Sequence, residues 1–325
     1  MAPGTPDDAD GGVHVVVYRV PLVTRFRGLT ARDGVLLRGP AGWGEFAPFW
    51  DYDDVASAPW LRAAREAAEV GWPAPVRDSV PVNVTVPAVD AVRAHAMVTA
   101  SGCATAKVKV AEPGQTLADD EARLEAVRDA LGPAGRIRVD ANAAWDAPTA
   151  IDALRRLDRA AGGLEYAEQP CRTIEELARV RRAIDVPIAA DEAVRLAADP
   201  MAVVRAEACD VVVLKVAPLG GVRAALELAE RVGVPVVVSS ALETSVGLAQ
   251  GVALAAALPE LPFACGLATA RLLAADVVAE PLLPVQGAIA VRRTAPDPAL
   301  LAAAAADPDT THRWQQRLAA VAEAT

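Results

Sequence analysis

The chain has 325 residues and a formal net charge of −10, and 53% of its residues are hydrophobic while 23% are charged. This length allows two domains with a large core, and no apolar run is long enough for a membrane span, which argues against a transmembrane protein. The acidic balance, with no basic cluster, argues against nucleic acids and anionic membranes as partners.

The N-terminal segment and the cysteines bear on where the protein works. Residues 1–12 are acidic and lack the basic and apolar regions of a signal peptide, so we expect a disordered leader. The cysteines are widely spaced, form no CxxC motif and lie in or beside apolar segments: Cys103, Cys171, Cys209 and Cys265. We interpret them as reduced core thiols, which favours a cytoplasmic protein.

Residues 13–78 predict an α+β domain. Segments rich in β-branched residues at 14–20 and 33–39 flank a polar and aromatic loop at 24–28. An alanine-rich segment at 55–70 has helical spacing. This block does not repeat later in the chain, so we expect it to form a domain of its own.

A regular alternation of strands and helices extends from residue 79 to about 279. Eight strands are expected, at 80–86, 103–110, 136–140, 163–168, 187–191, 210–215, 235–240 and 262–265. The segments between them have a helical period, as at 116–131, 147–160 and 221–232. About eight such units favour a closed α/β barrel of parallel strands. Residues 280–325 are expected to return to the first domain and to end in a helix at 311–325.

Three carboxylates end three successive predicted strands, and a lysine ends the next. Asp140, Glu168, Asp191 and Lys215 are separated by 28, 23 and 24 residues, about one strand plus one helix each. In a parallel barrel such positions open onto one face. Three oxygen ligands suit Mg²⁺, which keeps its other positions for water and substrate. The alternative is that each acid caps the helix that follows it.

The lysines supply a base. Lys107 and Lys109 are two residues apart in a strand, so they share a face, and we expect crowding and burial to lower the pKa of at least one. The alternative is a pair that faces solvent. Lys215 follows a buried run of valines, where a lysine is paired or functional, and Asp191 is a plausible neighbour. Together these residues predict metal-assisted proton abstraction next to the carboxylate of a small-molecule substrate.

The order of these motifs resembles the enolase superfamily and its muconate-lactonizing-type subgroup. The motifs are Lys107-Val-Lys109, Asp140-Ala-Asn142, Glu168-Gln169-Pro170, Asp191-Glu192 and Lys215. The resemblance implies a modified (β/α)7β barrel at 79–279, an N-terminal α+β capping domain at 13–78, and a C-terminal segment that packs on the cap. It implies that Asp140, Glu168 and Asp191 bind Mg²⁺ and that Lys109 and Lys215 are catalytic. Lys107, Asn142 and Glu192 are then expected to support them.

Further motifs are similar to those of the o-succinylbenzoate synthase family. They lie at 19–22, 25–28, 42–49, 51–54, 239–245 and 265–267. This resemblance implies a carbon–oxygen lyase of menaquinone biosynthesis, a hydro-lyase that dehydrates 2-succinyl-6-hydroxy-2,4-cyclohexadiene-1-carboxylate to 2-succinylbenzoate. It implies a Mg²⁺-dependent syn elimination through an enediolate, with Lys109 as acid and base and Lys215 as a cation that faces the intermediate.

The same resemblance implies contacts to the substrate. Arg25 and Phe26 belong to a loop expected to close over it, Ser240 is expected to hydrogen-bond its succinyl group, and Gly266 to let a backbone N–H approach it. Arg25 as part of a solvated hairpin and Ser240 as a helix N-cap are the alternatives. Ala268 stands where we expect a second glycine, and its methyl group is expected to narrow the succinyl end of the pocket.

Two alternative functions follow from the same residues. A racemase of N-acylamino acids or an epimerase of dipeptides with the same fold would use lysines on opposite faces of the substrate, and both lysines are present. A binding or structural barrel with a vestigial site is disfavoured, because none of the five motifs is broken. The sequence does not indicate an oligomeric state.

Overall fold

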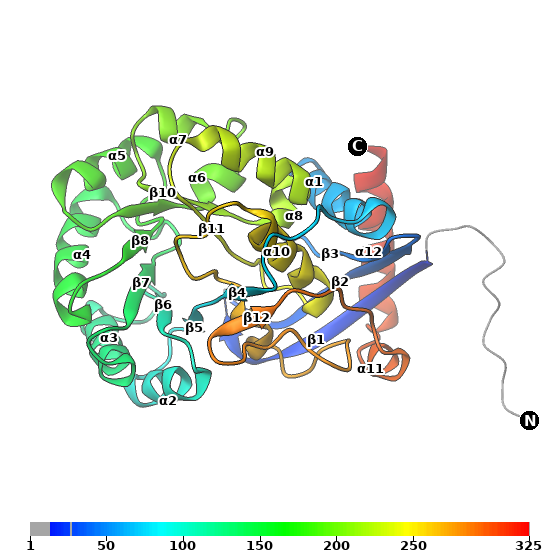
Figure 1. Cartoon of the computed structure of the whole chain (residues 1–325), viewed down its shortest axis with the longest axis horizontal. Helices are drawn as coiled ribbons and strands as arrows, with labels where there is room; N and C mark the ends of the chain where they lie inside the picture. The colour runs from blue at the N-terminus through cyan, green and yellow to red at the C-terminus, as the bar shows by residue number, and fades with distance from the viewer. Residues whose placement is uncertain (1–13, 27, 325) are drawn as a thin grey trace, which may run out of the picture.

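The computed structural model describes residues 14–26 and 28–324. The leader expected at 1–12 therefore lies outside the described residues, as does Arg27 of the expected loop. An N-terminal sheet lies to one side of a parallel barrel, and the C-terminal helix stands beside that sheet (Figure 1).

The N-terminal cap is a three-stranded antiparallel sheet followed by a helix. Its elements are β1 (His14–Phe26), β2 (Leu29–Gly39), β3 (Gly42–Phe46), α1 (Asp54–Arg65) and the π-helical turn η1 (Glu66–Val70). The loop predicted at 24–28 is wrong in part, because β1 continues to Phe26, which pairs with Leu29 after a register shift. The helix packs closely on β3, where a Cβ added to Gly44 would collide with the backbone of Ala64.

The barrel is a curled sheet of seven parallel strands in sequence order. They are β5 (Val84–Val86), β6 (Thr105–Lys109), β7 (Arg136–Asp140), β8 (Tyr166–Glu168), β9 (Ile188–Ala190), β10 (Val211–Leu214) and β11 (Val236–Val238). The eighth predicted strand makes only single bridges, from Cys265 to Val82 and from Gly266 to Ser239. These two bridges join the edges of the sheet, so the predicted modified barrel with an N-terminal cap is confirmed as the fold class.

Helices alternate with these strands around the barrel. They are α2 (Ala91–Ser101), α3 (Leu117–Leu131), α4 (Ala147–Ala161), α5 (Ile174–Ala183), α6 (Glu192–Arg195), α7 (Ala202–Arg205), α8 (Val216–Leu219), α9 (Val222–Val232), α10 (Ser245–Ala257) and the 3₁₀ turn η2 (Ala268–Leu272). Capping boxes begin α3 at Thr116 and α5 at Thr173. Within the described residues, no helix combines the length and the apolar character that a membrane crossing needs.

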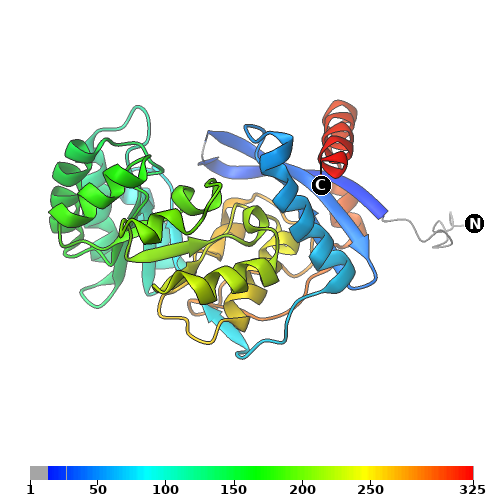
Figure 2. The same cartoon turned by 90° about the horizontal axis from the view of Figure 1, so that it is seen from above.

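The C-terminal residues contact both parts of the molecule. β12 (Ala288–Ala290) pairs with β4 (Ser79–Pro81), so the first predicted barrel strand is in fact two short strands, β4 and β5. After α11 (Pro298–Ala303), α12 (Pro308–Glu323) packs on the cap, as Figure 2 shows. Arg317 of α12 donates hydrogen bonds of 2.8 Å and 2.6 Å to the carbonyls of Phe49 and Tyr52. One apolar core runs through cap and barrel and includes Trp314 of this helix.

Candidate active site

The polar motifs of the sequence meet at one end of the barrel. Lys109 of β6 is the register partner of Asp140 on β7, and Asp140 is the partner of Glu168 on β8. Asp191 and Lys215 directly follow β9 and β10. Each of the five residues is at most 8% exposed. The strands are otherwise mostly valine, isoleucine and alanine, apart from Lys107 and Arg138, so the five charges lie at the ends of largely apolar strands.

Three lysines pair with the three carboxylates. The Lys107 ammonium donates to both oxygens of Glu168, at 3.0 Å and 2.9 Å, and lies 3.3 Å from Asp140. Lys109 donates to Asp140 at 2.6 Å, and Lys215 donates to Asp191 at 2.5 Å. Since a buried charge without a partner is strongly unfavourable, these pairs make the cluster possible inside the barrel.

The cluster separates the pKa values of its members. Burial and the neighbouring Asp140 raise the pKa of Glu168 to about 7. Burial opposes ionisation of Asp140 too, but Lys109 and Lys107 outweigh it and hold the Asp140 pKa well below its usual range. Burial lowers the pKa of Lys215 despite the Asp191 carboxylate beside it.

Lys107 differs from the expectation of a crowded, weakly basic pair. Burial lowers its pKa, but the Glu168 and Asp140 carboxylates outweigh burial and raise it above the ordinary value. The lowering expected for at least one lysine of the pair is therefore not found at Lys107, because the nearest charges are carboxylates. Lys107 is a fixed cation, in contrast to Lys215, whose pKa is lowered.

The helix-cap alternative for the three acids does not hold. The N-caps of α4 and α5 are Asp146 and Thr173, whose side chains accept the capping hydrogen bonds. Asp191 precedes α6, but its side chain makes no capping hydrogen bond there. The three carboxylates face the lysines instead.

A second set of polar groups holds the carboxylates in place. Asn142 accepts a hydrogen bond from Lys109 and donates to Glu192 at 3.2 Å. Arg195 donates to Asp191 at 2.9 Å and to Glu192 at 2.6 Å, and also contacts the Tyr52 hydroxyl of the cap. Asn142 and Glu192 were predicted, whereas Arg195 was missed. Its signal was the four-residue spacing from Asp191, which puts the two on one side of a helical turn.

Gln169 is the other residue that sequence reasoning missed, although it lies in the Glu-Gln-Pro motif. Its side-chain oxygen accepts hydrogen bonds from the backbone N–H groups of Asp191, at 2.9 Å, and of Ala193, at 3.1 Å. Gln169 has a positive φ of 40° and Asn142 one of 45°. Such backbone conformations are unfavourable for residues other than glycine and are held by the surrounding structure, often at functional sites.

Phe26 and Ser240 line the cavity above the charges, together with Gly266 and Thr269. The Lys109 ammonium lies 5.6 Å from the centre of the Phe26 ring. Ser240 is not a helix cap, since Thr244 caps α10, and its hydroxyl lies 2.5 Å from that of Thr269. Arg25 is exposed and is not part of the cavity wall, so the structure does not bring it to the other site residues.

Gly266 does not itself supply the backbone N–H that was expected to approach the substrate. This N–H donates to the Val238 carbonyl at 2.8 Å, because residue 266 bridges the edge of the sheet. The need for glycine comes from packing, since an added Cβ would lie 2.6 Å from the Ser239 hydroxyl. Gly266 therefore contributes space to the cavity.

The donor set fits a hard divalent cation. Asp140, Glu168 and Asp191 offer only oxygen atoms, and Lys107 already occupies a cation position between two of the three carboxylates. Among the described residues, no three acidic, histidine or cysteine side chains form a ready metal-binding group, because the carboxylates are directed at lysines and Arg195. A metal would have to compete with these ammonium groups.

Two family models match the chain. One, described as enolase C-terminal domain-like, matches residues 90–296. The other, enolase N-terminal domain-like, matches residues 17–68.

The chain is also similar to individual proteins. It is 64% identical to an o-succinylbenzoate synthase of Thermobifida fusca over 303 residues, 93% of this chain and 94% of that one. It is 52% identical to an o-succinylbenzoate synthase of Mycobacterium ulcerans over 322 residues, 98% of this chain and 97% of that one.

Solved structures share the fold at lower identity. A muconate lactonizing enzyme of Pseudomonas fluorescens has a TM-score of 0.77 at 22% identity, with 90% of this chain and 98% of that one covered. The L-Ala-D/L-Glu epimerase of Bacillus subtilis has a TM-score of 0.75 at 24% identity, with 88% and 96% covered.

Proposed function

We propose a reaction for this chain from the premise that it belongs to the o-succinylbenzoate synthase family of the enolase superfamily. Members of this family are hydro-lyases, and this chain is an enzyme of that class. The proposed reaction is the Mg²⁺-dependent syn-dehydration of 2-succinyl-6-hydroxy-2,4-cyclohexadiene-1-carboxylate to 2-succinylbenzoate, a step of menaquinone biosynthesis. The observation that carries it is the 64% identity over 93% of the chain.

Asp140, Glu168 and Asp191 are the proposed Mg²⁺ ligands. The bound ion would supply positive charge for the substrate carboxylate and for the enediolate that forms from it. Lys107, Asn142 and Glu192 are proposed to hold these carboxylates and Lys109 in position. Arg195 and Gln169 join that set, on the hydrogen bonds described above.

Lys109 is the proposed base and acid. Its amine removes the proton on the ring carbon next to the carboxylate, and the resulting ammonium returns that proton to the leaving hydroxyl on the same face. The C–H and C–O bonds break, a C=C bond forms, and water leaves, so one residue suffices for a syn elimination. Lys215 then faces the delocalised intermediate as a cation, and Phe26 and Ser240 line the wall next to the substrate.

A racemase or epimerase activity is the second candidate. It is favoured by one observation, that Lys109 and Lys215 both line the same cavity, so two bases can reach one substrate. Such an activity would use N-acylamino acids or dipeptides and the same carboxylate–metal set.

The test is to mix the purified protein with the cyclohexadiene substrate and Mg²⁺ and to follow loss of the diene absorbance. We expect fast turnover that EDTA abolishes and that Lys109→Ala and Lys215→Ala reduce strongly. If the protein binds Mg²⁺ without turning over this substrate, the synthase proposal fails. Deuterium exchange into N-succinyl amino acids and dipeptides then tests the second candidate.

A further inference from the structure

A buried arginine of the cap lies behind the catalytic cavity. Arg32 of β2 is 2% exposed, and within the described residues its guanidinium makes hydrogen bonds to three backbone carbonyls but no ion pair with a carboxylate. A charge in such a place is costly to bury, and a neutral side chain of similar volume would cost less. The cation therefore indicates a role beyond filling space.

The three carbonyls belong to segments of both domains. The Nε of Arg32 donates to the Leu242 carbonyl at 3.0 Å. Its two Nη atoms donate to the carbonyls of Asp33, at 3.3 Å, and of Ala47. Asp33 and Ala47 belong to the cap, whereas Leu242 lies in the barrel, in the loop between β11 and α10. One guanidinium thus joins the cap to this loop.

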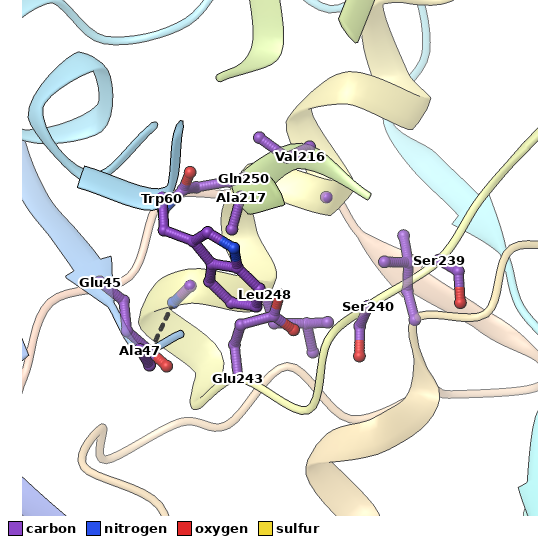
Figure 3. Close-up of a pocket in the computed structure, with 13 residues that line it drawn as sticks. Glu45, Ala47, Trp60, Val216, Ala217, Ser239, Ser240, Glu243, Leu248 and Gln250 are labelled. Atoms are coloured by element: carbon purple, nitrogen blue, oxygen red, sulfur yellow. Dashed lines mark hydrogen bonds between the residues drawn. The ribbon is translucent and has the colours of Figure 1, made fainter. Parts of the chain in front are cut away.

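The loop at 239–244 combines a strained backbone with hydrogen bonds to its own side chains. Leu242 has a φ of 67°, in the left-handed region that is unfavourable for residues other than glycine. Its N–H donates to the Ser240 hydroxyl at 3.1 Å, and the Ala241 N–H donates to the Glu243 carboxylate at 2.8 Å. Figure 3 shows Ser240 and Glu243 on the wall of a small cavity that cap residues also line. A hydrogen bond from the cap to the carbonyl of Leu242 therefore helps to fix the strained residue.

Two neighbours of Arg32 form part of the wall of the catalytic cavity. They are Leu242 and Phe49, and the guanidinium lies 4.6 Å from the centre of the Phe49 ring. Leu242 belongs to the same apolar cluster as Phe26, whose ring lies 5.6 Å from the Lys109 ammonium. In the described structure the guanidinium itself stays behind this wall. Arg32 thus supports the apolar surface that faces the proposed base.

We propose that Arg32 is a positioning residue for the reaction. It fixes the walls formed by Leu242 and Phe49 and, through Leu242, the Phe26 ring next to Lys109. The substrate is then held against the lysine amine in the geometry that proton transfer needs. This inference rests on the proposed function, and it gives Arg32 no contact with the substrate.

Steady-state kinetics test the proposal. In Arg32→Met we expect kcat for the cyclohexadiene substrate to fall about ten-fold while KM stays within about three-fold, because the lysines and carboxylates keep their places but the apolar wall shifts. Arg32→Lys keeps the charge and can reach one of the carbonyls, so it should recover part of the loss. If Arg32→Met yields no folded protein, Arg32→Lys is compared with the unaltered protein, and its kcat should fall without a rise in KM.

Arg128→Met is the matched control. Arg128 of α3 likewise donates to three backbone carbonyls, those of Ala161, Gly132 and Gly135, at 2.6 Å, 2.9 Å and 2.8 Å. Gly135 directly precedes β7, so these contacts lie at the end of the barrel away from the lysines. The kcat of Arg128→Met should not change, and a fall as large as that in Arg32→Met would overturn the proposal.

A double-mutant cycle tests whether Arg32 acts through Leu242. Leu242→Ala alone should lower kcat, and adding Arg32→Met should lower it by no more than about two-fold further, because residues that act as one unit have non-additive effects. If the two losses multiply in full, Arg32 acts independently of the wall and the proposal is overturned.

Hydrogen exchange provides a readout independent of turnover. Residues 239–244 should exchange about ten-fold faster in Arg32→Met than in the unaltered protein, and as in the unaltered protein in Arg128→Met. If the unaltered protein turns over the substrate but Arg32→Met keeps both kcat and slow exchange, the positioning role is refuted and the proposed function stands. If the unaltered protein turns over no substrate, the proposed function fails, and exchange at 239–244 decides whether Arg32 holds the wall.

Discussion

The catalytic end of the barrel and the junction between cap and barrel both bury carboxylates, but they give them different partners. At the catalytic end, Asp140 and Asp191 face ammonium and guanidinium groups. At the junction, Glu45 of β3 is 2% exposed and accepts a hydrogen bond of 2.6 Å from the Tyr18 hydroxyl. The N-terminus of α10 supplies the rest, through the Thr244 hydroxyl and backbone N–H groups at 3.2 Å and 3.0 Å.

The difference indicates which buried carboxylates can exchange one partner for another. In an ion pair, a metal ion or a substrate of matching charge can replace one partner. Glu168 keeps Lys107, and Asp191 keeps Arg195, when Lys109 or Lys215 changes partner. Glu45 is satisfied by neutral donors from cap and barrel, and truncation of its side chain leaves several of them buried and unpaired. The first cluster is the one proposed for chemistry, and the second links cap and barrel through Glu45.

The largest effect is expected for Lys109→Met. Turnover should fall roughly 10²- to 10⁴-fold, the usual contribution of a general acid or base. The free energy of unfolding should change by less than about 1 kcal/mol, because Asp140 keeps Lys107 as its partner at 3.3 Å. Diene-absorbance kinetics and urea unfolding measure the two quantities. A loss of turnover accompanied by a large fall in the free energy of unfolding would contradict the distinction between the two clusters.

Glu45→Ala is expected to lower the free energy of unfolding by about 3 kcal/mol, because the Tyr18 hydroxyl and the N-terminus of α10 lose their acceptor. Tyr18→Phe is the control, since it removes a single donor and should cost about 1 kcal/mol. Urea unfolding at pH 8 checks both. If Glu45→Ala lowered the free energy of unfolding no more than Tyr18→Phe does, Glu45 would not be what holds cap and barrel together.

The junction should also make stability depend on pH. Burial raises the pKa of Glu45 from 4.5 to about 7, although hydrogen bonds from Thr244 and Tyr18 limit the rise. Between these values the unfolded chain releases the proton while the folded protein retains it. The free energy of unfolding should therefore fall as pH rises from 4.5 to 7, by up to about 3 kcal/mol.

Urea unfolding of metal-free protein across that pH range measures the slope. Glu45→Gln should flatten it, and some slope should remain because the pKa of Glu168 is raised in the same direction. An unchanged slope in Glu45→Gln would assign the whole pH dependence to other groups.

The smallest effect is expected for Arg195→Met. Because Arg195 orients Asp191 through a hydrogen bond of 2.9 Å, its loss should weaken Mg²⁺ binding about ten-fold. Lys215 still pairs with Asp191, which keeps the loss at the lower end of such effects. Titration calorimetry of metal-free protein measures the affinity, with Arg195→Lys as the variant that keeps the charge. Tighter Mg²⁺ binding in Arg195→Met would mean that Arg195 acts as a repelling charge.

Much of the fold was predictable because barrel strands are short apolar runs at regular intervals, and a polar residue at the end of each run marks the active face. The predictions failed where pairing depends on a distant partner. Residues 80–86 have a valine at every second position and look like one strand, yet the first part of the segment pairs with β12 and the second part with β6. Residues 262–265 look like a strand, but the closing edges of the barrel leave room only for single bridges.

The sequence by itself determined the alternation of strand and helix, the barrel with its cap, and the identity of the carboxylates and lysines at the strand ends. Local composition and spacing suffice for the alternation and for the strand-end residues, since every parallel strand points its C-terminal end to the same face, whereas the cap was expected from the resemblance to the enolase superfamily. Apart from the pair of Lys215 and Asp191, which was expected, tertiary structure decided which charges touch. It raised the pKa of Lys107, engaged the Gly266 N–H in the sheet and brought Arg195 to Asp191. Burial and charge at each position depend on segments far apart in the chain, and no local pattern encodes them.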